Sequence, residues 1–185
     1  MSTGGDFIRA DYITREEMEH LLAALMPTNR LILEVCLNTG LRLGDVLNLK
    51  TAHLNERMTI REQKTGKTRS IRLSKQLLDR LLIEGGKIYV FTNRLDYRKH
   101  RTRQAVWKDL KRAAKLFRIP SQLNISPHSE RKIYAVGQFK RTCSIERVKE
   151  LLNHSSEAVT WIYAAADVLA RRKCPQYFEQ TTPLD

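Results

Sequence analysis

Residues 39–47, Thr-Gly-Leu-Arg-Leu-Gly-Asp-Val-Leu, decide how the first half of this chain folds. A segment with helical apolar spacing, about residues 29–38, precedes them, and Gly40 suits the left-handed backbone conformation that commonly ends a helix. A short helix that includes Leu49 is expected next. Arg42 therefore lies at the bend between two predicted helices, where its guanidinium can point into a cleft.

Two short segments around a glycine predict a pair of strands. Residues 58–62 and 69–73 flank the sequence Lys-Thr-Gly-Lys at 64–67. A glycine between two strand-like segments is typical of a β-hairpin that turns at the glycine. Residues 88–91 predict a further short buried strand or extended piece.

Serine and threonine residues mark the starts of other predicted helices, because their side chains accept hydrogen bonds from unpaired backbone N–H groups. These starts are Thr14, Ser74, Thr102, Ser126, Ser144 and Ser156. The helix from Thr102 is expected to bury Phe117, and the helix from Ser144 is expected to stop at Asn153. The predicted fold class is α+β, mainly α-helical, with a small antiparallel β-sheet formed by a hairpin at about 58–73.

The composition indicates a globular chain with an anionic partner. It has 185 residues, with 33 Lys and Arg against 20 Asp and Glu, a formal net charge of +13 and a pI of about 10.0. Hydrophobic residues make up 42% and charged residues 29%, which is unlike a disordered chain. No apolar run approaches the roughly 20 residues of a membrane span, and the N-terminus lacks a signal-peptide pattern. We therefore expect no secreted, membrane-spanning or fibrous protein, and a partner that is nucleic acid first and an anionic membrane second.

The sequence lacks the complete motifs of several other enzyme classes. Residues 66–68, Gly-Lys-Thr, resemble the end of a phosphate-binding P-loop, but that motif needs a glycine where Arg61 stands. The five histidines lack zinc-enzyme spacing, and no Gly-x-Ser-x-Gly motif occurs, so we expect no metal and no cofactor. Cys36, Cys143 and Cys174 form no Cys-x-x-Cys pair and are expected to be small buried or incidental residues in a reducing compartment.

Four polar segments stand where the helical pattern predicts packing or caps. They contribute, in chain order, Arg42, Lys64, His128, Arg131, His154 and Tyr163. His128 and Arg131 are three residues apart and share one face of a predicted helix. Together, from about Thr14 to Tyr163, these segments resemble the catalytic domain of tyrosine recombinases, the phage integrase family. That family carries an arginine in a Thr-Gly-x-Arg segment, a hairpin lysine, a His-x-x-Arg pair, a later histidine or tryptophan, and a nucleophilic tyrosine.

Three residues depart from the family pattern. Asn153 replaces the glycine before the histidine, and asparagine tolerates the same left-handed conformation. Asp45 replaces the commoner glutamate three residues after Arg42. Glu130 replaces the usual leucine before Arg131, which puts a carboxylate beside the site.

The resemblance implies a site-specific recombinase or integrase that cuts and rejoins DNA strands without metal or ATP. Attack on a phosphodiester builds charge on its non-bridging oxygens, and planar guanidinium groups suit that charge. Arg42 and Arg131 are the implied clamp. Tyr163 is the implied nucleophile, which forms a covalent 3′-phosphotyrosyl intermediate. Lys64, in preference to Lys67, is the implied general acid for the departing deoxyribose hydroxyl.

The two histidines complete the implied site, and other functions remain open. His128 is implied to assist deprotonation of Tyr163, and His154 to hydrogen-bond the phosphate. A type IB topoisomerase has a similar set of residues, and Glu130 favours a non-catalytic DNA-binding module of the same fold. Taken alone, a helical tyrosine next to Ile162 is typical of a core residue.

Basic residues outside the site are candidates for contact with the DNA backbone. They are Lys67 in the hairpin, Arg94, Arg98, Lys99, Arg101 and Arg103 in a predicted loop, and Lys108, Lys111, Arg112 and Lys115 along the helix from Thr102. The alternative is an ordinary solvated amphipathic face.

The resemblance also implies an organisation and partners. It divides the chain into an N-terminal extension (1–12), a catalytic domain (13–163) and a C-terminal tail (164–185) suited to contact between protomers. The family's usual N-terminal core-binding domain is expected to be absent. The implied partners are double-stranded DNA and other copies of the chain, which form tetramers in the family. The implied location is the prokaryotic cytoplasm, at the nucleoid.

Overall fold

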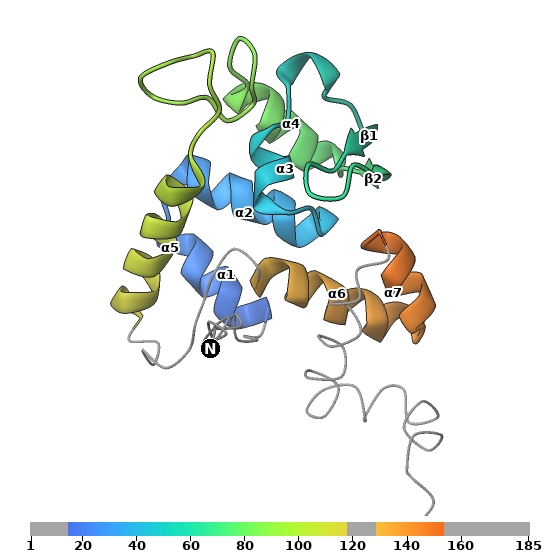
Figure 1. The fold of residues 1–185 in the computed structure, drawn as a ribbon. Helices are drawn as coiled ribbons and strands as arrows, with labels where there is room; N and C mark the ends of the chain where they lie inside the picture. The colour runs from blue at the N-terminus through green and yellow to red at the C-terminus, as the bar shows by residue number, and fades with distance from the viewer. Residues whose placement is uncertain (1–14, 118–128, 154–185) are drawn as a thin grey trace, which may run out of the picture.

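The structure, a computed structural model, describes residues 15–117 and 129–153. Its elements are α1 (Arg15–Ala23), α2 (Pro27–Thr39), α3 (Leu43–Leu47), a 3-10 turn (Thr51–His53), β1 (Arg57–Arg61), β2 (Thr68–Arg72), α4 (Lys75–Glu84), α5 (Arg103–Leu116), α6 (Ser129–Thr142) and α7 (Ile145–Leu151). β1 and β2 form a two-stranded antiparallel sheet at one side of the helices (Figure 1). The predicted mainly helical α+β class is confirmed. None of the helices in these two ranges is long and apolar enough to cross a membrane.

The central helix of the described residues is α2, which packs against α1, α3, α4 and α6 (Figure 1). Apolar residues occupy more than one side of it, and Ile32, Leu33 and Val35 are fully buried. Burial of each such side chain stabilises the fold by about 1.5–3 kcal/mol. This packing fixes where α3 and α6, the two helices next to the predicted site, lie relative to each other.

Hydrogen bonds from other elements stabilise the start of α2, and its end depends on a glycine. The Asp109 carboxylate of α5 accepts hydrogen bonds from Met26 N at 2.9 Å and Asn29 Nδ2 at 2.8 Å. Gly40 follows the helix with φ +65°, as predicted, and its N–H donates at 2.8 Å to the carbonyl four residues earlier. A Cβ on Gly40 would lie 2.4 Å from the Tyr134 ring of α6. Glycine therefore suits this position through both its backbone conformation and its small size.

The predicted hairpin is also confirmed. Met58 lies opposite Ile71, Ile60 lies opposite Arg69, and Gly66 in the turn has φ +67°. Side chains alternate between the two faces of a strand, so Arg69 shares the buried face of β2 with Ile71. The hairpin thus directs an arginine into the interior.

Three predicted helix starts lie within the described residues, and all three are confirmed. The hydroxyl oxygens of Ser74, Thr102 and Ser144 accept hydrogen bonds from N–H groups three residues later, at 3.3, 3.2 and 3.1 Å. The other three, Thr14, Ser126 and Ser156, lie outside the described residues.

Some expectations need correction. Leu49 is buried but lies beyond the end of α3. Phe117 follows the end of α5, and its side chain is 49% exposed, because the helix ends before it can reach the buried face. Cys143 is disulfide-bonded and so is not an incidental thiol, whereas Cys36 is the free buried thiol that was expected.

Residues 88–91 form the predicted extended piece. Tyr89 makes an isolated β-bridge with Lys50, and Val90 and Phe91 are buried. The basic loop that follows begins from this anchored segment and leads into α5.

Candidate active site

Arg42 lies at the corner between α2 and α3, as predicted. Its backbone is extended (φ −72°, ψ 147°), and its side chain is 15% exposed. Arg42 Nη1 donates to Glu62 Oε2 at 2.6 Å. A guanidinium has five N–H donors, so this bond leaves others that can face an anion.

Arg131, in the first turn of α6, is almost completely buried, with 1% of its surface exposed. Nη1 donates to the Gly40 carbonyl at 2.5 Å, and Nη2 donates to the Leu152 carbonyl at 3.0 Å. Nε has no hydrogen-bond partner among residues 15–117 and 129–153. Burial, together with the nearby charges of Arg42 and Arg69, lowers the pKa of Arg131 to about 10. Arg131 therefore joins α6 to the ends of α2 and α7 and stays cationic at neutral pH.

Arg69 is a third guanidinium in the same place, and it was not predicted. Nη1 donates to the Gly40 carbonyl at 3.2 Å, and Nη2 donates to the Thr39 carbonyl. The guanidinium carbon lies 5.8 Å from the centre of the Tyr134 ring. Burial lowers the pKa of Arg69. Arg69 and Arg131 thus share one carbonyl oxygen, at the left-handed end of α2.

Glu62 is the fully buried carboxylate that lies between Arg42 and Arg69, and sequence reasoning missed it too. It bonds Arg42, accepts a hydrogen bond from Thr65 Oγ1 at 2.9 Å, and lies 3.9 Å from Arg69 Nη1. Burial acts to raise the pKa of Glu62, but the Thr65 hydroxyl and the Arg42 charge outweigh it, and the pKa is lowered. The alternation of side chains along a strand could have predicted that Glu62 is buried. Met58 and Ile60 point inward, and Glu62 is the next residue in that alternating series.

The turn that carries Lys64 is held to this cluster at two points. One is the bond between Thr65 and Glu62. The other is the buried Asp45 of α3, whose Oδ1 accepts a hydrogen bond from Gln63 N at 2.8 Å. The Lys64 side chain is exposed. The hairpin lysine and Arg42 are therefore connected through one carboxylate.

Glu130 differs from what the sequence indicates. It is fully buried, and neither carboxyl oxygen has a hydrogen-bond partner in the part of the chain that the structure describes. Burial raises the pKa of Glu130 to about 8, because a charge is poorly solvated in the interior. The carboxyl group that the sequence puts beside Arg131 is therefore mostly protonated at neutral pH.

The rest of the predicted set lies outside the described residues, namely His128, His154 and Tyr163. Asn153, the residue before His154, is described and has φ +57°, so the predicted left-handed conformation is confirmed. The structure thus brings Arg42 and Arg131 together and ties the Lys64 turn to Arg42.

The basic residues proposed for DNA contact fall into two groups. Four are partly buried or ion-paired: Lys99 lies 3.6 Å from Asp96, Arg101 donates to Asn29 Oδ1 at 2.6 Å, Lys111 lies over the Trp107 ring, and Arg112 bonds Asp109 and the Ala24 carbonyl. The exposed residues that make no ion pair within the described parts of the chain are Lys67, Arg94, Arg98, Arg103, Lys108 and Lys115. Of these, Arg98 lies over the Tyr97 ring and Arg103 lies close to Gly44.

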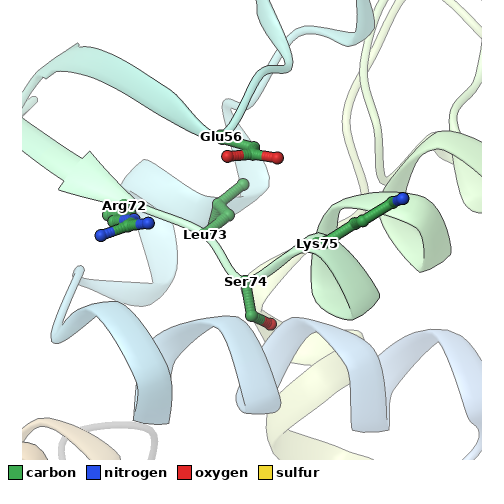
Figure 2. A pocket seen from close by; sticks show the side chains of 5 residues that line it. All are labelled: Glu56, Arg72, Leu73, Ser74 and Lys75. Carbon is green, nitrogen blue, oxygen red and sulfur yellow. The ribbon is translucent and has the colours of Figure 1, made fainter.

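A pocket of about 420 Å³ lies at the junction of β2 and α4 (Figure 2). Its lining residues are Glu56, Arg72, Leu73, Ser74 and Lys75. None of the predicted site residues lines it, so the pocket and the arginine cluster are separate features.

Comparison with known proteins places this site in a family. The model of the phage integrase family matches residues 11–169, which include every predicted site residue. The chain belongs to the phage integrase family. In this phage integrase domain, the matched range extends beyond both ends of the predicted domain at 13–163.

A similar curated protein is a tyrosine recombinase of Thermosipho africanus, 28% identical over 165 residues, which cover 83% of this chain and 56% of that protein. Other curated relatives are an integrase of Escherichia phage P2 and the XerA recombinase of Thermococcus kodakarensis, both 29% identical. The chain spans between 42% and 61% of the lengths of these three relatives.

Solved structures support the same fold. A lambda integrase dimer bound to a COC′ core site has a TM-score of 0.70 at 21% identity, covering 83% of this chain and 48% of that one. The catalytic domain of bacteriophage HP1 integrase has a TM-score of 0.62 at 20% identity, covering 96% of this chain and all of that one. The fold is therefore that of an integrase catalytic domain.

Proposed function

We propose that this chain is a tyrosine-type site-specific recombinase that cuts and rejoins DNA strands through a covalent 3′-phosphotyrosyl intermediate, without metal or ATP. The observation that carries the proposal is a cluster of three arginines beside the turn of Lys64: Arg69 and Arg131 donate to the Gly40 carbonyl, and Arg42 donates to Glu62. Guanidinium groups held in a water-poor site stabilise the charge that builds on a phosphate under attack. Membership of the phage integrase family supports the same activity.

In the proposed cleavage step, the Tyr163 phenol oxygen attacks the phosphorus. A bond between phosphorus and the phenol oxygen forms while the bond between phosphorus and the 5′ oxygen breaks. The phenol proton passes to His128, and Lys64 gives a proton to the departing 5′ oxygen. Arg42 and Arg131 hold the non-bridging oxygens throughout.

The rejoining step reverses this chemistry. A 5′ hydroxyl attacks the phosphotyrosyl phosphorus and displaces Tyr163, so the energy of the original phosphodiester is retained without ATP. In both directions His154 is proposed to donate a hydrogen bond to the phosphate. Because burial raises the pKa of Glu130 to about 8, this residue offsets little of the charge of Arg131 at neutral pH.

The proposed partners are double-stranded DNA and other copies of the chain. Backbone contact is proposed for the exposed group of cations, namely Lys67, Arg94, Arg98, Arg103, Lys108 and Lys115. The lambda integrase dimer on its core site supports self-association on DNA. We also propose boundaries of 13–163 for the catalytic domain, and the prokaryotic cytoplasm as its location, because the substrate is there.

A nicked suicide duplex with a randomised core sequence tests the activity. The wild-type chain should form a covalent protein–DNA adduct that survives denaturing electrophoresis, and Tyr163→Phe should bind the duplex without forming it. Binding without adduct by the wild-type chain would favour a non-catalytic DNA-binding module. Relaxation of supercoiled plasmid without sequence preference would favour a topoisomerase.

A further inference from the structure

We infer that Glu62 is a positioning residue of this site, whose buried carboxylate holds the Arg42 guanidinium and the turn of Lys64 in one arrangement. The inference rests on the proposed function, because the groups it positions are those proposed to act on the phosphate.

The contacts of Glu62 join separate parts of the chain. Oε2 accepts hydrogen bonds from Arg42 Nη1 at 2.6 Å and from Thr65 Oγ1 at 2.9 Å. Oε1 lies 3.9 Å from Arg69 Nη1. The backbone N–H and carbonyl of Glu62 make two further hydrogen bonds of 2.9 Å within the turn. One residue thus holds the α2–α3 corner through its side chain and the turn of Lys64 through its backbone.

The charge of Glu62 is needed because three guanidinium groups gather in one place. Arg69 and Arg131 both donate to the Gly40 carbonyl, and Arg42 lies close enough for its charge to act on Arg131. Like charges repel strongly where water is excluded. A buried carboxylate between Arg42 and Arg69 offsets that repulsion and lets the cluster form before any phosphate arrives.

The other buried carboxyl groups near the site do not have this arrangement. Asp45 accepts a hydrogen bond from a backbone N–H, and no ion pair to it is found among the described residues. The Glu130 carboxyl oxygens find no hydrogen-bond partner within the described ranges. Among the residues that the structure describes, Glu62 is therefore the carboxylate that bonds a cluster arginine directly.

Such a contact affects the rate of chemistry more than the affinity for DNA. A guanidinium bonded at Nη1 presents its remaining donors in one direction, and misplacing a reacting group by about 1 Å can lower a rate about 100-fold. Affinity for DNA comes mostly from backbone contacts spread over the surface. Loss of Glu62 should therefore lower the cleavage rate at saturating protein and leave the Kd nearly unchanged.

The experiment compares Glu62→Gln with a matched control. Glu34→Gln makes the same change in a partly buried carboxylate outside the cluster, which accepts a hydrogen bond from Arg30 Nε at 2.8 Å and forms an ion pair with Arg80 at 2.5 Å. Adduct formation on the nicked duplex and its Kd are measured for both variants. Glu62→Gln should lower the rate at least about tenfold with a Kd within about twofold of wild type, and Glu34→Gln should change neither. A rate within about twofold of wild type in Glu62→Gln overturns the inference.

Thr65→Val is a second variant for the same test. Residue 65 is exposed, so the substitution should not disturb folding, and the Glu62 carboxylate is retained. It removes one hydrogen bond to the carboxylate and should lower the rate about threefold without changing the Kd. An unchanged rate in Thr65→Val overturns the proposed hold on the turn.

A spectroscopic measurement separates this inference from the proposed function. The ¹⁵N–¹H signal of Arg42 Nε, assigned by its loss in Arg42→Lys, should shift in Glu62→Gln and stay in place in Glu34→Gln. If the wild-type chain forms no adduct, the proposed function is wrong. The Arg42 Nε signal then still decides whether Glu62 holds Arg42. An unmoved signal in Glu62→Gln overturns the inference.

Discussion

Arg131 Nη1 donates a hydrogen bond of 2.5 Å to the carbonyl oxygen of Gly40, a residue 91 positions earlier in the chain. Arg69 donates to the same oxygen at 3.2 Å. The left-handed conformation of Gly40 thus ends α2 and also places a carbonyl where two buried guanidinium groups meet. A helix end that is encoded locally has become part of the frame of the candidate site.

Gly40→Ala should destabilise the protein more than Gly66→Ala. Both glycines have positive φ, which costs another L-residue about 1–2 kcal/mol. A Cβ at residue 40 would also lie 2.4 Å from the Tyr134 ring, whereas nothing lies within 4 Å of one at residue 66. We expect urea unfolding to show an extra loss of about 1–3 kcal/mol for Gly40→Ala.

The same clash predicts a rescue. In a Tyr134→Ala background the ring is gone, so Gly40→Ala should cost about as much as Gly66→Ala. Equal costs for Gly40→Ala and Gly66→Ala in the wild-type background would contradict the steric explanation.

Glu130→Leu should stabilise the protein at neutral pH. The pKa of Glu130 is raised from 4.5 to about 8 by burial, so the folded state holds a proton that the unfolded state releases. Wild-type stability should therefore fall as pH rises from about 4.5 to 8, by at most about 1.4 kcal/mol per pH unit. Glu130→Leu should remove this slope and raise the free energy of unfolding at pH 7 by about 2–3 kcal/mol.

Urea unfolding between pH 5 and 8 measures this slope. Glu56→Leu is the control, because Glu56 is exposed and the substitution should leave the pH slope unchanged. A Glu130→Leu variant that keeps the wild-type slope would show that another group titrates.

Asp109→Asn should destabilise the protein at neutral pH and have a smaller effect at acidic pH. Burial acts to raise the pKa of Asp109, but hydrogen bonds from Asn29, Arg112 and Met26 N outweigh it, and the pKa is lowered from 3.8. The ionised carboxylate therefore contributes stability above about pH 4, which is lost as pH falls through the lowered pKa. We expect a loss of about 1–3 kcal/mol at pH 7 that shrinks below pH 4. The exposed Asp79 gives the control, Asp79→Asn, for which a similar loss would refute a specific role for Asp109.

Residues on a single helix test the division of the basic residues into two groups. Lys108 and Lys115 on α5 are exposed, whereas Arg112 bonds Asp109 and the Ala24 carbonyl. If DNA is the partner, Lys108→Ala and Lys115→Ala should each reduce the slope of log K against log salt by about 1. Arg112→Ala should leave that slope unchanged and lower the thermal stability. An unchanged slope in both lysine variants would show that DNA does not contact this face of α5.

Much of the fold was predictable because it depends on neighbouring residues. The caps at Ser74, Thr102 and Ser144 use hydrogen bonds over three residues, and the turn at Gly66 and the end of α2 at Gly40 use glycine's backbone freedom. Short-range spacing in the sequence records such interactions. The exposure of Phe117 was not predictable in this way, because it depends on where α5 ends.

The sequence by itself determined the helix starts confirmed among the described residues, the hairpin and the order of the family residues, and its charge predicted an anionic partner. Only the tertiary structure decided that Arg69 and Glu62 join the arginine cluster, that burial raises the pKa of Glu130, and that Arg112 pairs with Asp109. The physical reason is that burial and charge pairing depend on which distant segments meet. A residue's type records its charge in water, but its surroundings in the fold decide whether that charge persists and what it binds.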